Sequence, residues 1–211
     1  VWQGNNEALY PQEKNTFYEA VLEGFGSDNV KYVKGVEIDS IISIEDAVNA
    51  AKDVDVVIAS LGEAPYCETP GNIFDLTLHE AQLKLVDELS KTGKPIVLVL
   101  FEGRPRVINK IVNKVDAVVM GYLPGLEGGN AMVDILLGDV NPSGKLPFSY
   151  PKSVAGYTTY DHKPIEESED NHYLPEWPFG FGLSYSTFEY SNLLVSDAKS
   201  LNDVIKVSVD V

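Results

Sequence analysis

Two carboxylates lie in a short loop that directly follows a strand-like run of the chain. The run extends from Val54 to Leu61, and the loop from Gly62 to Asn72 contains Glu63 and Glu68. A helix-like segment follows, so the loop is expected at the carboxyl end of a strand, where open α/β sheets place their ligand crevices. Its glycine and proline residues favour a shaped loop. A carboxylic acid held there can donate or accept a proton in catalysis.

The same loop contains the single cysteine of the chain, Cys67. One cysteine excludes an internal disulfide and a cysteine-cluster metal site. A nucleophilic thiolate requires a neighbouring base or cation, whereas Glu63 and Glu68 oppose its formation. Residue types alone therefore leave two alternatives for this loop: a catalytic carboxylate, or acidic side chains that are only solvated.

Other kinds of site have weaker support in the sequence. No phosphate-binding glycine-rich loop and no Gly-x-Ser-x-Gly elbow occurs. Glycines 125, 128 and 129 fit a tight turn before a helix better than an anion site. The histidines at positions 79, 162 and 172 lack metal-ligand spacing. Arg104 follows an apolar strand and is predicted to anchor a loop by bidentate bonding to a carboxylate, in preference to contacting a ligand.

Strand-like and helix-like segments alternate along the first three quarters of the chain. Helices are expected at 15–24, 43–52, 77–89, 107–112 and 126–137, and strands at 30–36, 54–61, 95–101, 115–122 and 146–150. Short apolar strands between helices indicate βαβ units and a mostly parallel sheet covered on both faces. The expected fold is a three-layer αβα sandwich of the α/β class.

The pattern changes towards the C-terminus. Residues 1–155 are assigned to the α/β domain, and residues 156–183, which include an acidic run and prolines, to an extended connector. Residues 187–194 and 204–211 predict two strands, which cannot form a stable sheet alone. Residues 184–211 are therefore interpreted as the truncated start of a β-sandwich domain, and the chain as a fragment.

Charge and composition restrict the partners. Acidic residues outnumber basic ones by 32 to 16, which gives a formal charge of −16. This charge disfavours nucleic acids and anionic membranes. No apolar stretch approaches the roughly 20 residues of a membrane span. The compartment stays open, with a secreted or periplasmic location favoured over a cytoplasmic one.

The loop resembles the second domain of glycoside hydrolase family 3, in its β-glucosidase and exo-β-glucanase branch. The matching residues run from Gly62 to Asn72 and continue at Leu76-Thr77-Leu78. Further matches follow in the family's order at 103–105, 122–128, 137–147 and 178–190, the last resembling the entry into a fibronectin-III-like domain. Each match is weak alone, but their shared order and spacing make the resemblance specific.

The resemblance implies a retaining, cofactor-free β-glycosidase that removes terminal β-linked glucose. Glu68 matches the family's acid/base best, with Glu63 as the runner-up that supports the loop. The family's nucleophile is an aspartate on a preceding (β/α)8 barrel, which this chain does not contain, so the chain alone is expected to be inactive. Trp2 and Tyr66 are expected to contact substrate. Asn72 stands where the family usually has an aspartate.

Two alternatives belong to other functional classes. The first is a non-catalytic carbohydrate-binding or interaction module that keeps only the fold. The second is a flavodoxin-like signalling or nucleotide domain, against which the missing phosphate loop argues. Binding of free sugar by the isolated chain would favour the first, and binding of a phosphate ligand would favour the second.

Overall fold

A computed structural model describes residues 11, 14–156, 174–197, 200 and 202–211. Three parallel strands form the central sheet: β1 (Val57–Gly62), β2 (Ile96–Phe101) and β3 (Ala117–Met120). Their order is β1-β2-β3, and Leu98 of β2 lies beside Ala59 of β1 and Val118 of β3. The middle strand carries the apolar run IVLVLF, in which four residues are fully buried, as expected for a parallel strand covered on both faces.

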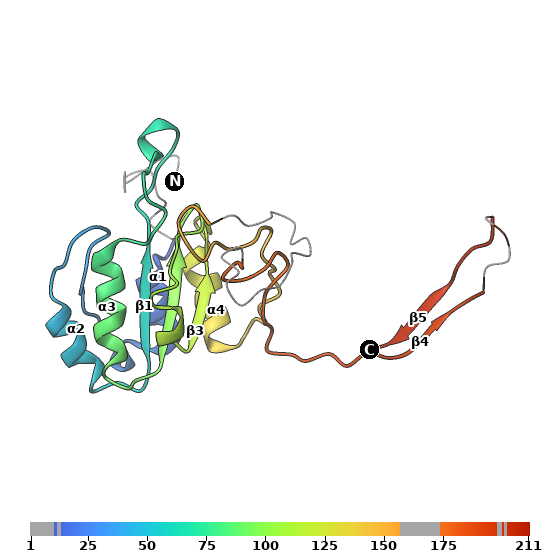
Figure 1. The fold of residues 1–211 in the computed structure, drawn as a ribbon. Coiled ribbons are helices and arrows are strands. Elements are labelled where there is room, and N and C mark those ends of the chain that lie inside the picture. The colour runs from blue at the N-terminus through green and yellow to red at the C-terminus, as the bar shows by residue number, and fades with distance from the viewer. Residues whose placement is uncertain (1–10, 12–13, 157–173, 198–199, 201) are drawn as a thin grey trace.

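Helices cover both faces of this sheet (Figure 1). Helices α2 (Ile44–Ala51) and α3 (Glu80–Ser90) lie on one face, and α1 (Phe17–Phe25) and α4 (Gly128–Leu137) pack together on the other. The three-layer α/β sandwich predicted from the sequence is therefore confirmed.

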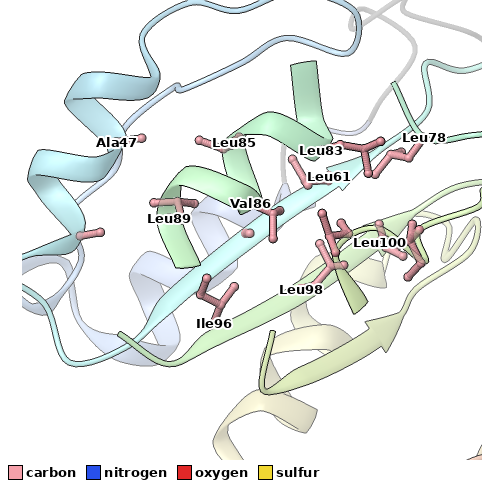
Figure 2. Close-up of a cluster of buried hydrophobic side chains, with 14 of the residues drawn as sticks. Ala47, Leu61, Leu78, Leu83, Leu85, Val86, Leu89, Ile96, Leu98 and Leu100 are labelled. Carbon is pink, nitrogen blue, oxygen red and sulfur yellow. The ribbon is translucent and has the colours of Figure 1, made fainter. Parts of the chain in front are cut away.

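The larger core lies between α3 and the sheet (Figure 2). Leu85, Val86 and Leu89 of α3 recur at helical spacing and face Ile96 and Leu98 of β2. Burying each such side chain contributes about 1.5–3 kcal/mol. This packing fixes the carboxyl end of β1 relative to the start of α3, and the loop with the two carboxylates spans those two points.

Local signals set the helix ends. Ser43 caps α2 by accepting a hydrogen bond from the Asp46 amide at 3.2 Å, as the sequence predicts. Thr16 and Glu19 form a reciprocal capping box at the start of α1. Gly138 ends α4 in the left-handed conformation, with φ of 84°.

The segment 30–36, predicted as a strand, does not pair with the sheet. Only Val36 makes a bridge, an antiparallel one to Ile41. A β-carbon at Gly35 would lie 2.9 Å from Leu85 Cδ1 and 3.2 Å from Ala47 Cβ. The segment therefore crosses close to α2 and α3. Val33 and Val36 pack against the main core, and Val30 packs against the cluster between α1 and α4, so these side chains are used in packing and the backbone joins no sheet.

Two further predicted elements are also wrong. Residues 107–112 do not form a helix. The Val107 amide and carbonyl bond to Leu76 and Leu78 in a parallel bridge, and the residues after it form only a turn that leads into a 3₁₀ turn, η4 (Val112–Lys114). Residues 146–150 make separate backbone contacts with residues 176–181, as in the bridge from Tyr150 to Trp177. Pro147 and Pro178 lack the amide hydrogens that a continuous ladder needs.

The two C-terminal strands form a separate antiparallel hairpin, as the sequence predicts. They are β4 (Ser191–Val195) and β5 (Val207–Asp210), and all of their residues are exposed. Figure 1 shows the hairpin apart from the α/β layers. None of the helices in the described part of the chain has the length and apolar composition of a membrane span.

Gly62, the last residue of β1, is predicted to tolerate no side chain. Its φ is 151°, and a β-carbon there would lie 1.9 Å from the carbonyl oxygen of Phe101 on the neighbouring strand. We expect Gly62→Ala to lower the free energy of unfolding by about 4 kcal/mol or more, because two backbone strands would have to separate. Denaturant unfolding measures this loss.

Gly93→Ala is the matched control for that substitution. Gly93 also has a positive φ, 72°, but a β-carbon there would meet no atom of the described residues within 4 Å. Gly93→Ala should lower the free energy of unfolding by only about 1 kcal/mol, which is the cost of placing alanine at a positive φ. Equal losses for the two variants would show that the close approach at Gly62 is unimportant.

Candidate active site

The loop between β1 and α3 projects from one end of the sheet (Figure 1). Its base is fixed by Gln82, a fully buried residue of α3. The side-chain oxygen of Gln82 accepts a hydrogen bond from the Gly62 backbone amide at 2.9 Å. The side-chain nitrogen of Gln82 donates to the Gly62 carbonyl at 2.9 Å and to the Ile38 carbonyl at 2.7 Å. A buried amide with its partners satisfied stabilises one backbone position, so the loop starts from a defined point.

Glu63 lies just beyond that point and is held by two arginines. Its Oε1 accepts from Arg104 Nε at 2.9 Å and from Arg106 Nη1 at 2.7 Å, and its Oε2 accepts from the Gly103 amide at 3.3 Å. The Glu63 side chain is 7% exposed and that of Arg106 is 13% exposed. Hydrogen bonds between charged groups in such a site are strong, and Glu63 is fully engaged by them. Glu63, Arg104 and Arg106 are called the arginine clamp below.

The arginine clamp also forms hydrogen bonds to loop residues that follow Glu68. Arg104 Nη1 donates to the Gly71 carbonyl at 2.7 Å, and Arg106 Nη2 donates to the Thr77 carbonyl. The Arg104 guanidinium lies 4.0 Å from the centre of the Tyr66 ring. Cation–π contact of this kind adds about 0.5–2 kcal/mol. The clamp therefore fixes the loop on both sides of Glu68.

Glu68 differs from Glu63 in each of these respects. Its side chain is exposed, and among the residues that the structure describes it has no hydrogen-bond or ion-pair partner. Its φ of 50° and ψ of −144° lie in a region where side chains are strained. A 3₁₀ turn, η3 (Thr69–Gly71), follows at once. The loop thus presents one free carboxylate between two anchored points.

The backbone strain at Glu68 can be measured by comparing two truncations. Its dihedral angles are close to those of the first central residue of a type II′ turn, where glycine dominates. We expect the Glu68→Gly protein to be more stable than the Glu68→Ala protein by about 1 kcal/mol. Denaturant unfolding measures the difference.

Glu45, exposed in the first turn of α2, supplies a control of opposite sign. There the glycine variant should be less stable than the alanine variant by roughly 0.5–1 kcal/mol, because the position is helical. Equal stability of the two Glu68 variants would show that this residue carries no strain.

The other residues singled out in the sequence have different surroundings, and the structure does not describe three of them. Trp2 and histidines 162 and 172 lie outside the described residues. Tyr66 is half-buried against Arg104, and burial, followed by the Glu63 carboxylate, raises the pKa of its hydroxyl. Cys67 is a partly exposed free thiol. His79 caps α3, since its Nδ1 accepts from the Ala81 amide at 3.2 Å.

Arg104 anchors a loop through a carboxylate, as predicted, but its bonding is not bidentate: Nε bonds to Glu63, and Nη1 bonds to the Gly71 carbonyl. The sequence did not predict three residues that hold the loop or lie beside it: Arg106, Gln82 and the buried Glu102. Each had a signal, because Arg106 repeats the charge of Arg104 two residues later, Gln82 interrupts the apolar face of its helix, and Glu102 directly follows an apolar strand. No cluster of metal-ligating side chains occurs among the described residues.

Comparisons with known proteins give the family. Residues 4–185 match the glycosyl hydrolase family 3 C-terminal domain. A lysosomal β-glucosidase from Dictyostelium discoideum is 40% identical over 95% of this chain, and a β-xylosidase from Formosa agariphila is 35% identical over 92%. The solved structure of a β-glucosidase from Erythrobacter marinus superposes with a TM-score of 0.78 at 28% identity over 93% of the chain.

The chain spans only part of each of these proteins. It covers 25% of the Dictyostelium enzyme, 29% of the Formosa enzyme and 31% of the Erythrobacter chain. The relatives are therefore much longer polypeptides. The family match covers most of the chain, and the chain belongs to glycosyl hydrolase family 3 as part of its C-terminal domain.

Proposed function

We propose that this chain is the second domain of a longer, retaining β-glycosidase and that Glu68 is its general acid/base. The observation that carries the proposal is the contrast between the two loop carboxylates. Glu63 is nearly buried and bound by two arginines, whereas Glu68 is exposed and, among the described residues, unpartnered. A proton donor must be able to reach substrate, and of Glu63 and Glu68 only Glu68 has an exposed side chain.

The reaction follows from two carboxylates that flank a glycosidic bond. The nucleophile, an aspartate on a preceding (β/α)8 barrel outside this chain, attacks the anomeric carbon and forms a covalent glycosyl-enzyme. As the bond to the leaving oxygen breaks, Glu68 transfers its proton to that oxygen. The Glu68 carboxylate then removes a proton from water, which attacks the anomeric carbon and releases the sugar with its original configuration. Glu68 ends the cycle protonated.

The arginine clamp has a positioning role in this proposal. Retaining glycosidases hold their two carboxyl groups about 5–5.5 Å apart, so a small displacement of the acid weakens proton transfer. The clamp fixes the loop at Gly71 and Thr77 and packs against Tyr66. Glu63 supports the loop by neutralising the two arginines, which agrees with the role expected for the runner-up carboxylate.

The barrel domain and the bound sugar are the partners that the site requires. The acid role needs Glu68 to be protonated when substrate binds, and poorly solvated surroundings favour that state in carboxylic acids. In this chain the Glu68 side chain is exposed. In this proposal the barrel and the substrate shield the Glu68 carboxyl group from solvent. Contacts of Tyr66 and Trp2 with the sugar belong to the same proposal.

The sugar is proposed to be a terminal β-linked glucose. The relatives include enzymes named β-glucosidase and one named β-xylosidase, so the two sugars must be compared directly. The test is to assay the complete polypeptide on aryl β-glucosides and β-xylosides and to follow the anomeric configuration of the first product by NMR. We expect faster hydrolysis of the glucoside, with retention. Inversion would contradict the proposed chemistry.

The isolated chain gives a second test. It should hydrolyse neither substrate, because it lacks the nucleophile. It should also bind glucose and cellobiose weakly, because most sugar contacts are assigned to the barrel. Tight binding of either sugar by the chain alone would favour a carbohydrate-binding module instead.

A further inference from the structure

Glu102 is a fully buried acid at the carboxyl end of β2, directly behind the arginine clamp. Its Oε1 accepts from the Arg106 amide at 3.1 Å and lies 2.9 Å from the Tyr150 hydroxyl oxygen. Among the described residues, its Oε2 has no hydrogen-bond partner. The guanidinium groups of Arg104 and Arg106 bond to Glu63 and to loop carbonyls instead. Glu102 is therefore a buried acid that forms no ion pair with any of the described residues, which is rare for an ionised side chain.

The hydrogen bonds around Tyr150 indicate where a proton must lie. The Tyr150 hydroxyl oxygen is 2.7 Å from the Arg106 carbonyl oxygen and 2.9 Å from Glu102 Oε1. A tyrosine hydroxyl has one proton, and a carbonyl can only accept. If Glu102 were ionised it could also only accept, and one of the two contacts would lack a proton. Both contacts are satisfied when Tyr150 donates to the Arg106 carbonyl and a protonated Glu102 donates to Tyr150.

The electrostatic surroundings favour the same state. Burial, the largest effect, raises the pKa of Glu102 to about 7, and the Glu63 carboxylate acts in the same direction. The hydrogen bond from the Arg106 amide and the charge of Arg106 act in the opposite direction, as would a hydrogen bond from Tyr150 if its proton pointed to Glu102 and not to the Arg106 carbonyl. The titratable groups that interact with Glu102 among the described residues are Glu63 after β1, Arg106, Tyr150, Tyr66 of the loop, and Tyr122 after β3. Burial comes first and Glu102 second in raising the pKa of Tyr122.

We propose that Glu102 is a positioning residue that works as a neutral acid: protonated Glu102 ties Tyr150 to the 102–106 turn and so holds Arg106 against Glu63 and the loop that carries Glu68. The proposal rests on the proposed function for its effect on catalysis, but not for the protonation state. Ionised Glu102 would place a second negative charge beside Glu63 and compete for Arg106. The clamp would then loosen, and proton transfer from Glu68 would weaken.

The protonation state is tested by stability. The folded protein holds the Glu102 proton at a higher pH than the unfolded chain, so between the ordinary glutamate pKa of 4.5 and about 7 the folded state binds more protons. Its stability contribution therefore falls as pH rises through this window. We compare thermal unfolding of the complete enzyme and its Glu102→Gln variant from about pH 5 to about pH 8.

The test depends on how the difference in Tm between wild type and Glu102→Gln changes with pH. A constant loss of stability caused by the glutamine side chain does not affect it. The wild type should lose several degrees of Tm relative to Glu102→Gln across this range. The exposed acid Glu80 gives the control, and Glu80→Gln should leave the wild-type slope unchanged. A difference that stays constant, or that grows in favour of the wild type with pH, would overturn the protonated state.

The positioning role is tested by leaving-group dependence. In the complete enzyme, Glu102→Ala and Tyr150→Phe should lower kcat/KM by about tenfold or more for a β-glucoside that needs a proton to leave. Dinitrophenyl β-glucoside needs no proton, and its kcat/KM should change much less. Equal losses on both substrates would overturn the positioning role. If Glu68→Ala itself shows no leaving-group dependence, the proposed function fails, while the Tm comparison remains a test of the Glu102 proton.

Discussion

Glu68→Ala in the complete enzyme should reduce kcat/KM by about 10²–10⁴-fold for alkyl β-glucosides and cellobiose, whose leaving oxygens need a proton. For dinitrophenyl β-glucoside, kcat/KM should change far less, because that leaving group departs as an anion. The kcat for this substrate should still fall, since release of the glycosyl-enzyme loses its base. Steady-state kinetics on a leaving-group series measure both effects.

Two variants control for indirect effects of this substitution. Glu68→Gln keeps the size of the side chain but cannot donate an acidic proton, and it should behave like Glu68→Ala. Glu45→Ala removes an exposed carboxylate from α2, away from the loop, and should leave both rate constants unchanged. Near wild-type activity of Glu68→Ala on cellobiose would exclude Glu68 as the acid.

Glu63→Ala should cost about 3 kcal/mol of unfolding free energy, the largest stability effect expected from a charged residue in this loop. It leaves two largely buried guanidinium groups, 13% and 24% exposed, without their carboxylate. The loop anchors at Gly71 and Thr77 depend on those groups, so hydrolysis should fall as well. Denaturant unfolding of the variant and the wild type measures the loss.

Asp53→Ala is the matched control for Glu63→Ala. It breaks the ion pair between Lys31 and Asp53, whose side chains are 51% and 74% exposed. Exposed pairs contribute about 0–1 kcal/mol, so this variant should unfold near the wild-type midpoint. Azide distinguishes the two carboxylates in activity, because it should not restore turnover to Glu63→Ala. A Glu63→Ala protein as stable as the wild type would contradict the clamp.

The elements that the sequence predicts well are those in which local and tertiary signals agree. The strand 95–101 is a continuous apolar run and became the buried β2. Ser43 with its acidic first turn marked the start of α2, and the apolar spacing of 77–89 marked α3. In each case the periodicity of one segment matches what its neighbours bury.

The failures have a common cause, which is contact with a segment distant in the sequence, either by packing or by backbone pairing. The valines of 30–36 favour a strand, but the chain passes close to α2 and α3 at Gly35. Val107 bonds to residues near 77 instead of starting a helix. No local pattern contains this information, since propensity is weak beside tertiary contacts.

In the candidate site, too, local sequence predicts some features, and others depend on residues distant in the chain. Position in the loop identified Glu63 and Glu68, and the family resemblance favoured Glu68. The difference between them depends on Arg104 and Arg106, which lie about 40 residues away along the chain. Likewise the Glu102 proton depends on Tyr150, 48 residues away. Partners at such separations can be assigned only once the fold brings them together.

The configuration of the azide product is the most direct test of Glu68. Azide is added to the Glu68→Ala enzyme with dinitrophenyl β-glucoside, and the products are identified by NMR. Azide should enter the space left by the carboxyl group, attack the glycosyl-enzyme from the side that water uses, restore kcat and yield β-glucosyl azide. An α-glucosyl azide would identify residue 68 as the nucleophile, and the absence of both rescue and azide product would contradict its role as acid/base.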